Sequence, residues 1–474
     1  MIGCMLFIKS FLLTLVIGAN APVDQTKFLQ QLLDKNAGKA LVFPAGTYLV
    51  KTLTVPKQTR LTITSKTIIK GMPSEGPLPI LTLGTDVYLT GGGLIDGNRT
   101  QRKKGTGLQA FDAQNVRIEN LRIREIAEQA VQLAGCKKVV LRNLQIVGCG
   151  AKGVSQAQGI NIVTSQDIAV ANCSVAKAQH GIQWWGDDKS GWCENIRISN
   201  NQVRDVEAGG IWGNKGRAVT VVTNRVTNCG DVGIDFEHSI GCSATSNQVQ
   251  NCKNYALAVF YGSEQIQFIQ NTVNQGITYG HGLGLVGDGL NKHISLKGGV
   301  ITINGAGSCG VITIGTNVAE DVLIQGARIT TKGSGGIPIR IIDNNRFQII
   351  NNPLISGANA TGISLEGASN SLVEGNNIVH IGLDGSKLSD RGGIFVFFRS
   401  AAYPAQNNKI RQNTIKGYKT GINDECWGDV NSNNVFEQNT TPNLVHRAAN
   451  GTWGGRSSGN LTLDKAVAPV STKQ

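Results

Sequence analysis

Two carboxylates placed two residues apart are the part of this chain best suited to chemistry. Asp235 and Glu237 alternate with the apolar residues Ile234 and Phe236. Residues i and i+2 of a strand point to the same face, about 6.5–7 Å apart, so the pattern predicts two outward acids and two inward apolar side chains. Neighbouring carboxylates push each other's pKa values apart, which lets one stay protonated while the other attacks or activates water. Cleavage of a glycosidic bond needs such a pair.

Aromatic side chains are expected on both sides of this pair. With the second strand of each repeat aligned on its Gly-Ile dipeptide, one outward column reads Gln132, Asn161, Gln183, Trp212, Asp235 and Ala258, and the neighbouring column reads Ala134, Val163, Trp185, Asn214, Glu237 and Phe260. Trp185 and Trp212 thus precede the acids, and Phe260 and Tyr261 follow them. Because aromatic rings stack on the apolar faces of sugars, we predict that the two acids are catalytic and that the four rings bind substrate.

Further acids lie close to these strands in the sequence. Asp205 and Glu207 come just before the strand of the second tryptophan, and we predict them as additional catalytic carboxylates. The loop upstream carries Asp187, Asp188 and Trp192, which we predict to bind substrate because loops above a rigid scaffold commonly hold ligands. The alternative for the two loop aspartates is a Ca²⁺ site, and the alternative for Asp235 and Glu237 is that they are ordinary solvated charges.

Two histidines are candidates for the same face. His238 follows the second acid and would face inward unless the strand ends at Glu237. His281 stands between two glycines, two repeats later. We predict both as substrate-binding residues. The chain has no Cys-x-x-Cys motif, so a zinc site is not predicted, and no residue is assigned as a metal ligand.

These candidates belong to a chain that repeats itself. A unit of the form apolar-x-apolar-x-x-Asn recurs along the sequence, with Gly replacing Asn in two units. The markers are Asn120, Asn143, Asn172, Asn200, Asn224, Asn247, Asn271, Gly298, Gly326, Asn351, Asn376, Asn413 and Asn439. Their spacing is roughly two dozen residues and slightly elastic, which is typical of one structural unit stacked many times.

Each unit predicts short strands. Ile196-Arg197-Ile198 is one of many triplets with the two-residue period of a strand. A second strand follows each marker and often opens with Gly-Ile. Strands with Asn and Gly at the bends predict an all-β fold, a single-stranded right-handed parallel β-helix solenoid over residues 111–444. The marker asparagines are expected to form a ladder of amides inside a turn.

The ends of the chain predict caps. Asp24 to Lys35 has the pattern of an amphipathic helix with Asp24 as its N-cap, and such a helix would cover the open end of the solenoid. Phe43 to Tyr48 (Phe-Pro-Ala-Gly-Thr-Tyr) and Gly91 to Asn98 resemble the N-terminal cap and first coils of the pectate-lyase-like β-helix superfamily of polysaccharide-active enzymes and tailspike-like proteins. We assign residues 22–110 to this cap and first coils, and residues 445–474 to a C-terminal cap and tail.

Within that superfamily the resemblance to polygalacturonases is partial. Gly233-Ile234-Asp235 and Gly280-His281-Gly282 are similar to two strands of those hydrolases, which implies a substrate-binding role for His281. The family's Asp-Asp pair on the intervening coil is replaced by Asn254-Tyr255, so its acids do not carry over. Asp235 to His238 is also similar to the Asp-x-His pair of mannuronan C5-epimerases, with the histidine one place late.

The N-terminus predicts export. Lys9, an apolar run over residues 11–17 and Ala19-Asn20-Ala21 are typical of a secretory signal over residues 1–21. We therefore expect a secreted, extracellular protein without stable membrane insertion after signal cleavage; an uncleaved anchor or a buried capping helix is the alternative. Cys229 and Cys252 fall on adjacent repeats, within disulfide range, although buried free thiols fit the sequence equally well.

The charge balance favours acidic partners. The 474 residues carry a net charge of +13, and a basic surface attracts anions, so the polysaccharide substrate could itself be acidic. Nucleic acid is not predicted, because the basic residues are scattered and their one cluster, residues 99–104, is interpreted as a solvated loop. No cofactor is predicted, and the resemblance to spike proteins leaves a homotrimer open.

Three functions fit these observations. The first is an extracellular glycoside hydrolase that cleaves a polysaccharide with its carboxylate pair. The second is a polysaccharide lyase or epimerase acting on a uronic-acid polymer, which would need a base such as His238 and a cation such as Ca²⁺ to neutralise the carboxylate. The third is a non-catalytic glycan-binding spike or adhesin.

Overall fold

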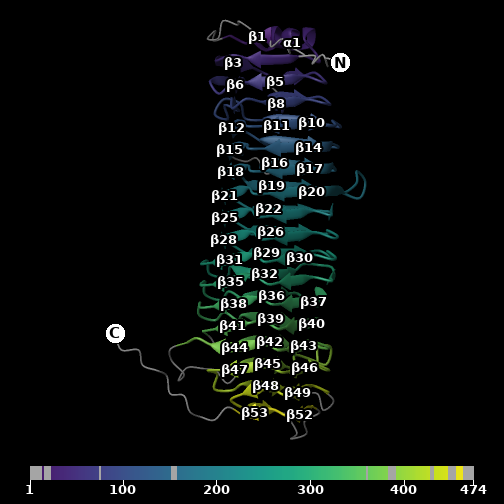
Figure 1. The fold of residues 1–474 in the computed structure, drawn as a ribbon, viewed down its shortest axis with the longest axis vertical. Helices are drawn as coiled ribbons and strands as arrows, with labels where there is room; N and C mark the ends of the chain where they lie inside the picture. Colours follow the sequence, from purple (N-terminus) through teal and green to yellow (C-terminus); the bar gives the residue numbers. More distant parts are fainter. Residues whose placement is uncertain are drawn as a thin grey trace, which may run out of the picture. The chain divides into compact units, whose positions relative to one another are not determined.

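The structure is a computed structural model that describes residues 13–14, 23–73, 76–150, 157–358, 361–382, 391–426, 432–446 and 455–462. The chain divides into two compact units, residues 1–225 and 226–474. Parallel strands in each unit belong to three sheets, called sheet A, sheet B and sheet C, and the fold is a single-stranded right-handed parallel β-helix (Figure 1). The predicted fold class is confirmed.

One coil of the first unit shows how the chain turns through the three sheets. β19 (His180–Trp185) lies in sheet C, β20 (Cys193–Ser199) in sheet A and β21 (Gln202–Val206) in sheet B, and β22 (Ile211–Asn214) returns to sheet C. β19 and β22 pair in parallel, with Ile182 opposite Ile211. Both isoleucines and Trp184 are fully buried, so the alternate residues of each strand fill the interior, as predicted.

Sheet C carries the candidate sites of both units. In the first unit its strands are β4 (Leu53–Val55), β7 (Leu81–Leu83), β10 (Leu108–Phe111), β13 (Val131–Ala134), β16 (Gln158–Val163), β19 and β22. In the second unit they are β26 (Val232–Glu237), β29 (Tyr255–Phe260), β32 (His281–Val286), β36 (Val311–Ile314), β39 (Ile339–Ile342), β42 (Ile363–Glu366), β45 (Ile394–Phe397), β48 (Ile422–Glu425) and β51 (Leu444–His446). Constant register along each series stacks equivalent side chains in columns.

The asparagine ladder exists, but the marker residues fall in two adjacent columns. One column sits at the bend with positive φ and contains Asn120, Asn143, Asn172, Asn200 and Asn351. The other follows the bend, is buried, and contains Asn201, Asn224, Asn247, Asn271, Asn352, Asn376, Asn413 and Asn439. The buried amides bond from coil to coil: Asn376 Nδ2 donates to Asn413 Oδ1 at 2.9 Å and to the Ile349 carbonyl at 2.7 Å. The sequence does not separate the columns because Asn suits both a left-handed bend and a buried turn with free carbonyls.

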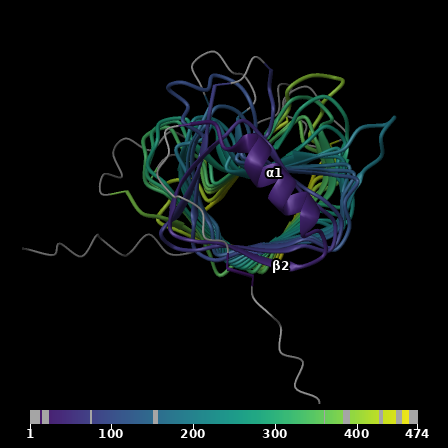
Figure 2. The same cartoon turned by 90° about the horizontal axis from the view of Figure 1, so that it is seen from above.

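The N-terminal helix covers the first coil. α1 (Thr26–Lys35) begins two residues later than predicted, and Asp24 Oδ1 accepts a hydrogen bond from the Thr26 backbone N–H at 2.9 Å. Leu29 and Leu33 are fully buried, and Figure 2 shows α1 lying across the open end of the coil. The helix thus shields the interior from solvent at this end.

Strands continue into the region predicted as the C-terminal cap. β52 (Arg456–Ser458) pairs with β49 (Val435–Glu437), and β53 (Leu461–Thr462) pairs with β50 (Thr440–Thr441). The solenoid pattern therefore extends past residue 444 within the second unit. The short, polar strands explain why hydrophobic periodicity did not reveal it.

The basic cluster at residues 99–104 is partly internal, contrary to the interpretation as a solvated loop. Arg102 is only 2% exposed. Its guanidinium donates to the carbonyls of Lys51 at 2.9 Å and Met72 at 2.8 Å, and also to the Leu78 carbonyl. Burial lowers the pKa of Arg102. The side chain ties together strand ends that would otherwise leave buried carbonyls unsatisfied.

The cysteines and the N-terminal segment complete the comparison with the sequence. All nine cysteines among the described residues, Cys229 and Cys252 included, are buried thiols outside any disulfide. The predicted signal over residues 1–21 lies outside the described residues except for β1 (Leu13–Thr14), which pairs with β2 (Ala40–Phe43). In the part of the chain that the structure describes, the helix is too short and polar to cross a bilayer.

Candidate functional site

In the first unit, three strands of sheet C bring two outward columns together. β16, β19 and β22 pair in register, which aligns Asn161, Gln183 and Trp212 in one column and Val163, Trp185 and Asn214 in the next. These are the columns that the sequence predicts. The inward residues between them are fully buried, so the face is held by a rigid core.

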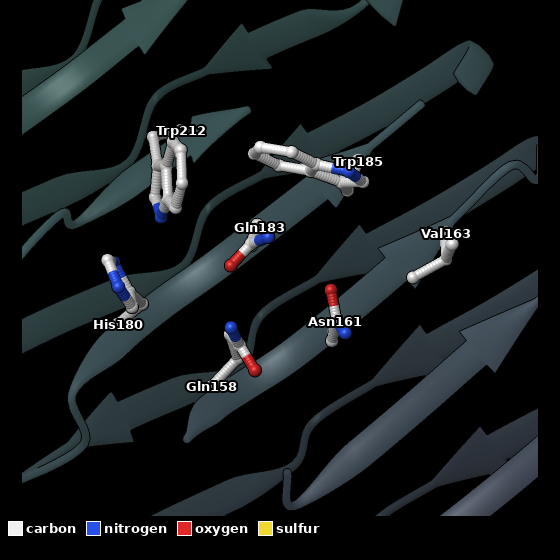
Figure 3. Close-up of a pocket in the computed structure, with 7 residues that line it drawn as sticks. All are labelled: Gln158, Asn161, Val163, His180, Gln183, Trp185 and Trp212. Carbon is white, nitrogen blue, oxygen red and sulfur yellow. The ribbon is translucent and has the colours of Figure 1, made fainter. Parts of the chain in front are cut away.

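These columns line a groove of about 300 Å³, called the indole groove (Figure 3). Its lining residues are Gln158, Asn161, Val163, His180, Gln183, Trp185 and Trp212. The rings of Trp185 and Trp212 meet edge to face, with centroids 6.0 Å apart and planes at 74°. The His180 ring lies 4.9 Å from that of Trp212. The groove therefore combines an aromatic wall with an amide floor.

Several polar atoms of the indole groove lack a hydrogen-bond partner among the described residues. They are Gln158 Oε1, Asn161 Oδ1, Gln183 Oε1 and Trp212 Nε1, and all four atoms are buried. The residues that carry the three amides are each less than one-tenth exposed. Buried polar atoms are normally paired in folded proteins, so these atoms are available to a ligand that enters the groove.

Two lining residues, Gln158 and His180, were missed at the sequence level. They pair with each other in register and stand just before the Gly-Ile dipeptides at Gly159 and Gly181. Simple alternation places this position inward, but both side chains line the groove. His180 Nδ1 accepts the backbone N–H of Gly209 at 3.2 Å. The polar residue directly before these two Gly-Ile dipeptides is the signal that could have identified this third column.

The predicted loop residues have local partners. Asp187 Oδ1 accepts the backbone N–H groups of Lys189 and Ser190 at 2.8 and 2.7 Å, and these bonds lower its pKa. Asp188 pairs with Lys215 at 2.5 Å. The side chain of Asp187 thus shapes its own turn, and neither aspartate lines the groove.

Trp192 also lies apart from the groove lining. The Arg217 guanidinium covers its ring at 4.8 Å from the centroid. A cation–π contact of this kind stabilises the loop. The ring is therefore engaged locally.

The carboxylates predicted before β22 are not on sheet C. Asp205 belongs to β21 of sheet B and pairs with Arg204 at 2.7 Å. Glu207 is exposed in the turn that follows. Their proximity to Trp212 in the sequence does not place these acids on sheet C, because the chain turns a corner between sheet B and sheet C; their catalytic role stays a prediction.

In the second unit, β26 carries the carboxylate pair with the predicted register. Asp235 lies opposite Ala258 and Glu237 opposite Phe260 on β29, while Ile234 and Phe236 are fully buried in the interior. The acids are on the outer face but are not solvated charges: Asp235 is only 3% exposed and Glu237 is half-buried. Trp185 and Trp212 belong to the first unit, so the expectation that they flank the pair stays a prediction.

The pKa of Glu237 is raised toward neutral pH, as a catalytic acid requires. Burial, followed by the nearby charge of Asp231, raises its pKa from 4.5 to about 7. Asp231 accepts a hydrogen bond from Asn254 Nδ2 at 2.6 Å, which holds it in place. Asp231, Asp235 and Glu237 are called the carboxylate cluster. Asp231 was missed because it precedes the alternating part of the strand.

Aromatic rings surround the carboxylate cluster. Tyr255 and Phe260 meet edge to face at 6.0 Å, and Phe260 lies 5.5 Å from Tyr261. His238 stacks on Tyr261 at 5.3 Å and is exposed, because β26 ends at Glu237. A side chain at Gly284 would meet the Tyr255 ring at 2.4 Å, so this ring lies over the outer face of the sheet.

His281 is a neutral member of this surface. Its ring stacks on Tyr255 at 5.7 Å, and its Nδ1 accepts the backbone N–H of Cys309 at 2.9 Å. Burial, then the charge of Arg340, lowers its pKa to about 4. Near neutral pH the imidazole is therefore uncharged, with its proton on Nε2. It can donate a hydrogen bond but cannot serve as a cation.

Comparison with known proteins agrees with this architecture. The family model described as "Right handed beta helix region" matches residues 154–297 and 291–464. The Streptococcus pneumoniae surface protein and adhesin PfbA is 15% identical, with a TM-score of 0.51 over 70% of this chain and 95% of its own. A family 28 exopolygalacturonase from Yersinia enterocolitica is 14% identical, with a TM-score of 0.47 over 75% of this chain and 76% of its own. No curated protein matches in sequence. The likeness to the adhesin concerns the fold alone.

Proposed function

The chain belongs to the right-handed β-helix family, and on this scaffold we propose that it is an extracellular glycoside hydrolase that degrades a polysaccharide. The observation that carries the proposal is the carboxylate cluster on the outer face of sheet C. There, half-buried Glu237 lies beside Asp231, two residues from Asp235 on the same face, among aromatic rings. Paired acids in unlike surroundings among exposed rings suit the cleavage of a sugar–sugar bond.

The two acids take different roles in the proposed reaction. Glu237 keeps its proton near neutral pH and donates it to the glycosidic oxygen as the bond to the sugar carbon breaks. Asp235, as the second carboxylate of the pair, stabilises the positive charge on the sugar ring and accepts a proton from the attacking water, which leaves one new hydroxyl on each product. Asp231 acts as a positioning residue, because its charge holds the proton on Glu237.

The surrounding rings supply binding. Phe260 and Tyr261 offer apolar surface to the faces of sugar rings, and Tyr261 is 37% exposed. Neutral His281 offers an Nε2–H donor to a hydroxyl. His238, stacked on Tyr261, extends this surface at the strand end.

Product analysis tests the proposal. The protein is incubated with a panel of neutral and acidic polysaccharides, and reducing ends and ultraviolet absorbance are followed together. Hydrolysis gives new reducing ends without an absorbing, unsaturated end. Asp235→Asn and Glu237→Gln should each reduce the rate at least about a hundredfold, about 2.7 kcal/mol in activation free energy, whereas Glu264→Gln, on a bridge outside sheet C, should be unchanged.

Other outcomes reject the proposal. Full activity in both variants would remove the site assignment. Absorbing ends would identify a lyase instead. Binding of a polysaccharide to the protein without cleavage would identify a glycan-binding protein, which is the second candidate function. That candidate is favoured by one observation, the indole groove, whose lining contains no carboxylate and so offers binding without an acid.

A further inference from the structure

The lining of the indole groove consists mainly of amide and indole groups, which carry no charge. Three amides, two indoles, one imidazole and one valine form the surface, with no Lys, Arg, Asp or Glu among them. This contrasts with the net charge of +13 over the whole chain. The overall charge predicts an acidic ligand, but the groove offers no guanidinium or ammonium group to pair with one.

The amides of the groove differ from those above them in the same column. On the preceding coils Gln109 Nε2 donates to Gln132 Oε1 at 2.9 Å, so that pair is satisfied internally. The next two amides, Asn161 and Gln183, keep buried oxygens without partners among the described residues, as does Gln158 beside them. A buried polar atom left unpaired is costly. The column therefore changes from a self-satisfied ladder to an open set of amides where the groove begins.

Hydroxyl groups match these amides. An amide has one accepting oxygen and two N–H donors, and a hydroxyl both donates and accepts, so either orientation of each amide finds a partner on a sugar. A carboxylate only accepts. It would leave the amide oxygens unpaired and would itself be buried without a cation, which is unfavourable.

The two indole rings offer the surface on which a sugar ring could stack. Trp185 is 38% exposed and offers its ring to solvent, while Trp212 meets it edge to face and also contacts the His180 ring. A volume of about 300 Å³ is at the lower end of the range for small-ligand sites. It suits a single sugar ring with its apolar face on the indoles and its hydroxyls on the amides.

We infer that the indole groove is a binding subsite for an uncharged hexopyranose unit of the polysaccharide, and that it discriminates against uronic acids. The inference rests on the proposed function only in that the ligand is a glycan. It does not depend on catalysis by Glu237.

Calorimetric titration of the full chain tests the subsite. The Glu237→Gln variant, which should not turn over substrate, is titrated with hexasaccharides of β-1,4-linked glucose, mannose and galactose, and with those of galacturonic and mannuronic acid. At least one neutral hexasaccharide should bind with an affinity that changes little with salt, because no ion pair is formed. Gln183→Leu and Trp185→Ala should each weaken that binding at least about tenfold, and Val147→Ala, exposed on sheet B, should not.

Each outcome decides the inference. Binding confined to the uronic-acid oligomers, binding to none of the five, or neutral binding that survives both groove substitutions would overturn it. Unchanged melting temperatures of the groove variants separate lost contacts from lost folding. If the protein binds a neutral hexasaccharide but cleaves no polysaccharide, the subsite stands and the hydrolase is rejected. If it cleaves acidic polymers and Gln183→Leu does not change that rate, the hydrolase stands and the subsite is rejected.

Discussion

Replacing Glu237 by Gln should make the protein more stable at high pH. The folded structure raises the pKa of Glu237 from 4.5 to about 7, chiefly through burial. The ionised form is therefore disfavoured in the folded state, by roughly 3 kcal/mol at about 1.36 kcal/mol per pKa unit. Ionising this buried carboxyl group at high pH lowers the free energy of unfolding, whereas a neutral amide at the same position would not.

The sign follows from proton binding. Between pH 4.5 and about 7 the folded chain keeps the Glu237 proton and the unfolded chain has lost it, so the free energy of unfolding falls as pH rises through this window and levels off above it. Glu237→Gln removes that dependence. The variant should match the wild type near pH 4.5 and exceed it by up to roughly 3 kcal/mol at about pH 8.

Urea unfolding followed by tryptophan fluorescence at several pH values measures this difference. Glu437→Gln, on β49 of sheet A, serves as the control for replacing a glutamate by its amide, and the gain of Glu237→Gln over wild type at about pH 8 should exceed that of Glu437→Gln. A Glu237→Gln variant whose advantage is independent of pH, or which is less stable than wild type at high pH, would refute the reasoning about burial.

Two further substitutions probe the scaffold. Asn376→Ala removes a buried amide that bonds to the coils on both sides and should lower the free energy of unfolding by about 3 kcal/mol. Asn377→Ala, at the half-buried neighbouring position, should cost less than about 1 kcal/mol, and similar losses for the two would contradict the ladder's role. Gly213→Ala places a methyl group 2.2 Å from the Trp184 carbonyl oxygen and 2.4 Å from its ring. This overpacking should lower the free energy of unfolding by roughly 2 kcal/mol, and the melting temperature should drop by several degrees. Gly76→Ala, where an added methyl meets nothing, is its control, and an equal melting temperature for both would be the adverse result.

The register of the outer face could be predicted because strand periodicity is local. Alternation around Ile234 and Phe236 is enough to place Asp235 and Glu237 on the outer face, and the Gly-Ile alignment is enough to stack Asn161, Gln183 and Trp212. Both arrangements are present in the paired strands. The same local pattern could not tell which of two neighbouring positions each asparagine occupies, since both positions at the bend accept Asn.

The chain alone therefore determined a right-handed β-helix with a capping helix and the face on which its acids and rings lie. Only the tertiary structure decided how those side chains behave. It buries Asp235 to 3% exposure, places Asp231 near Glu237, turns Gln158 and His180 into the indole groove and moves Asp205 to another sheet. The physical reason is that periodicity fixes which side of a strand a residue occupies, whereas burial, pKa and partners depend on neighbours one coil away and on the bends between sheets.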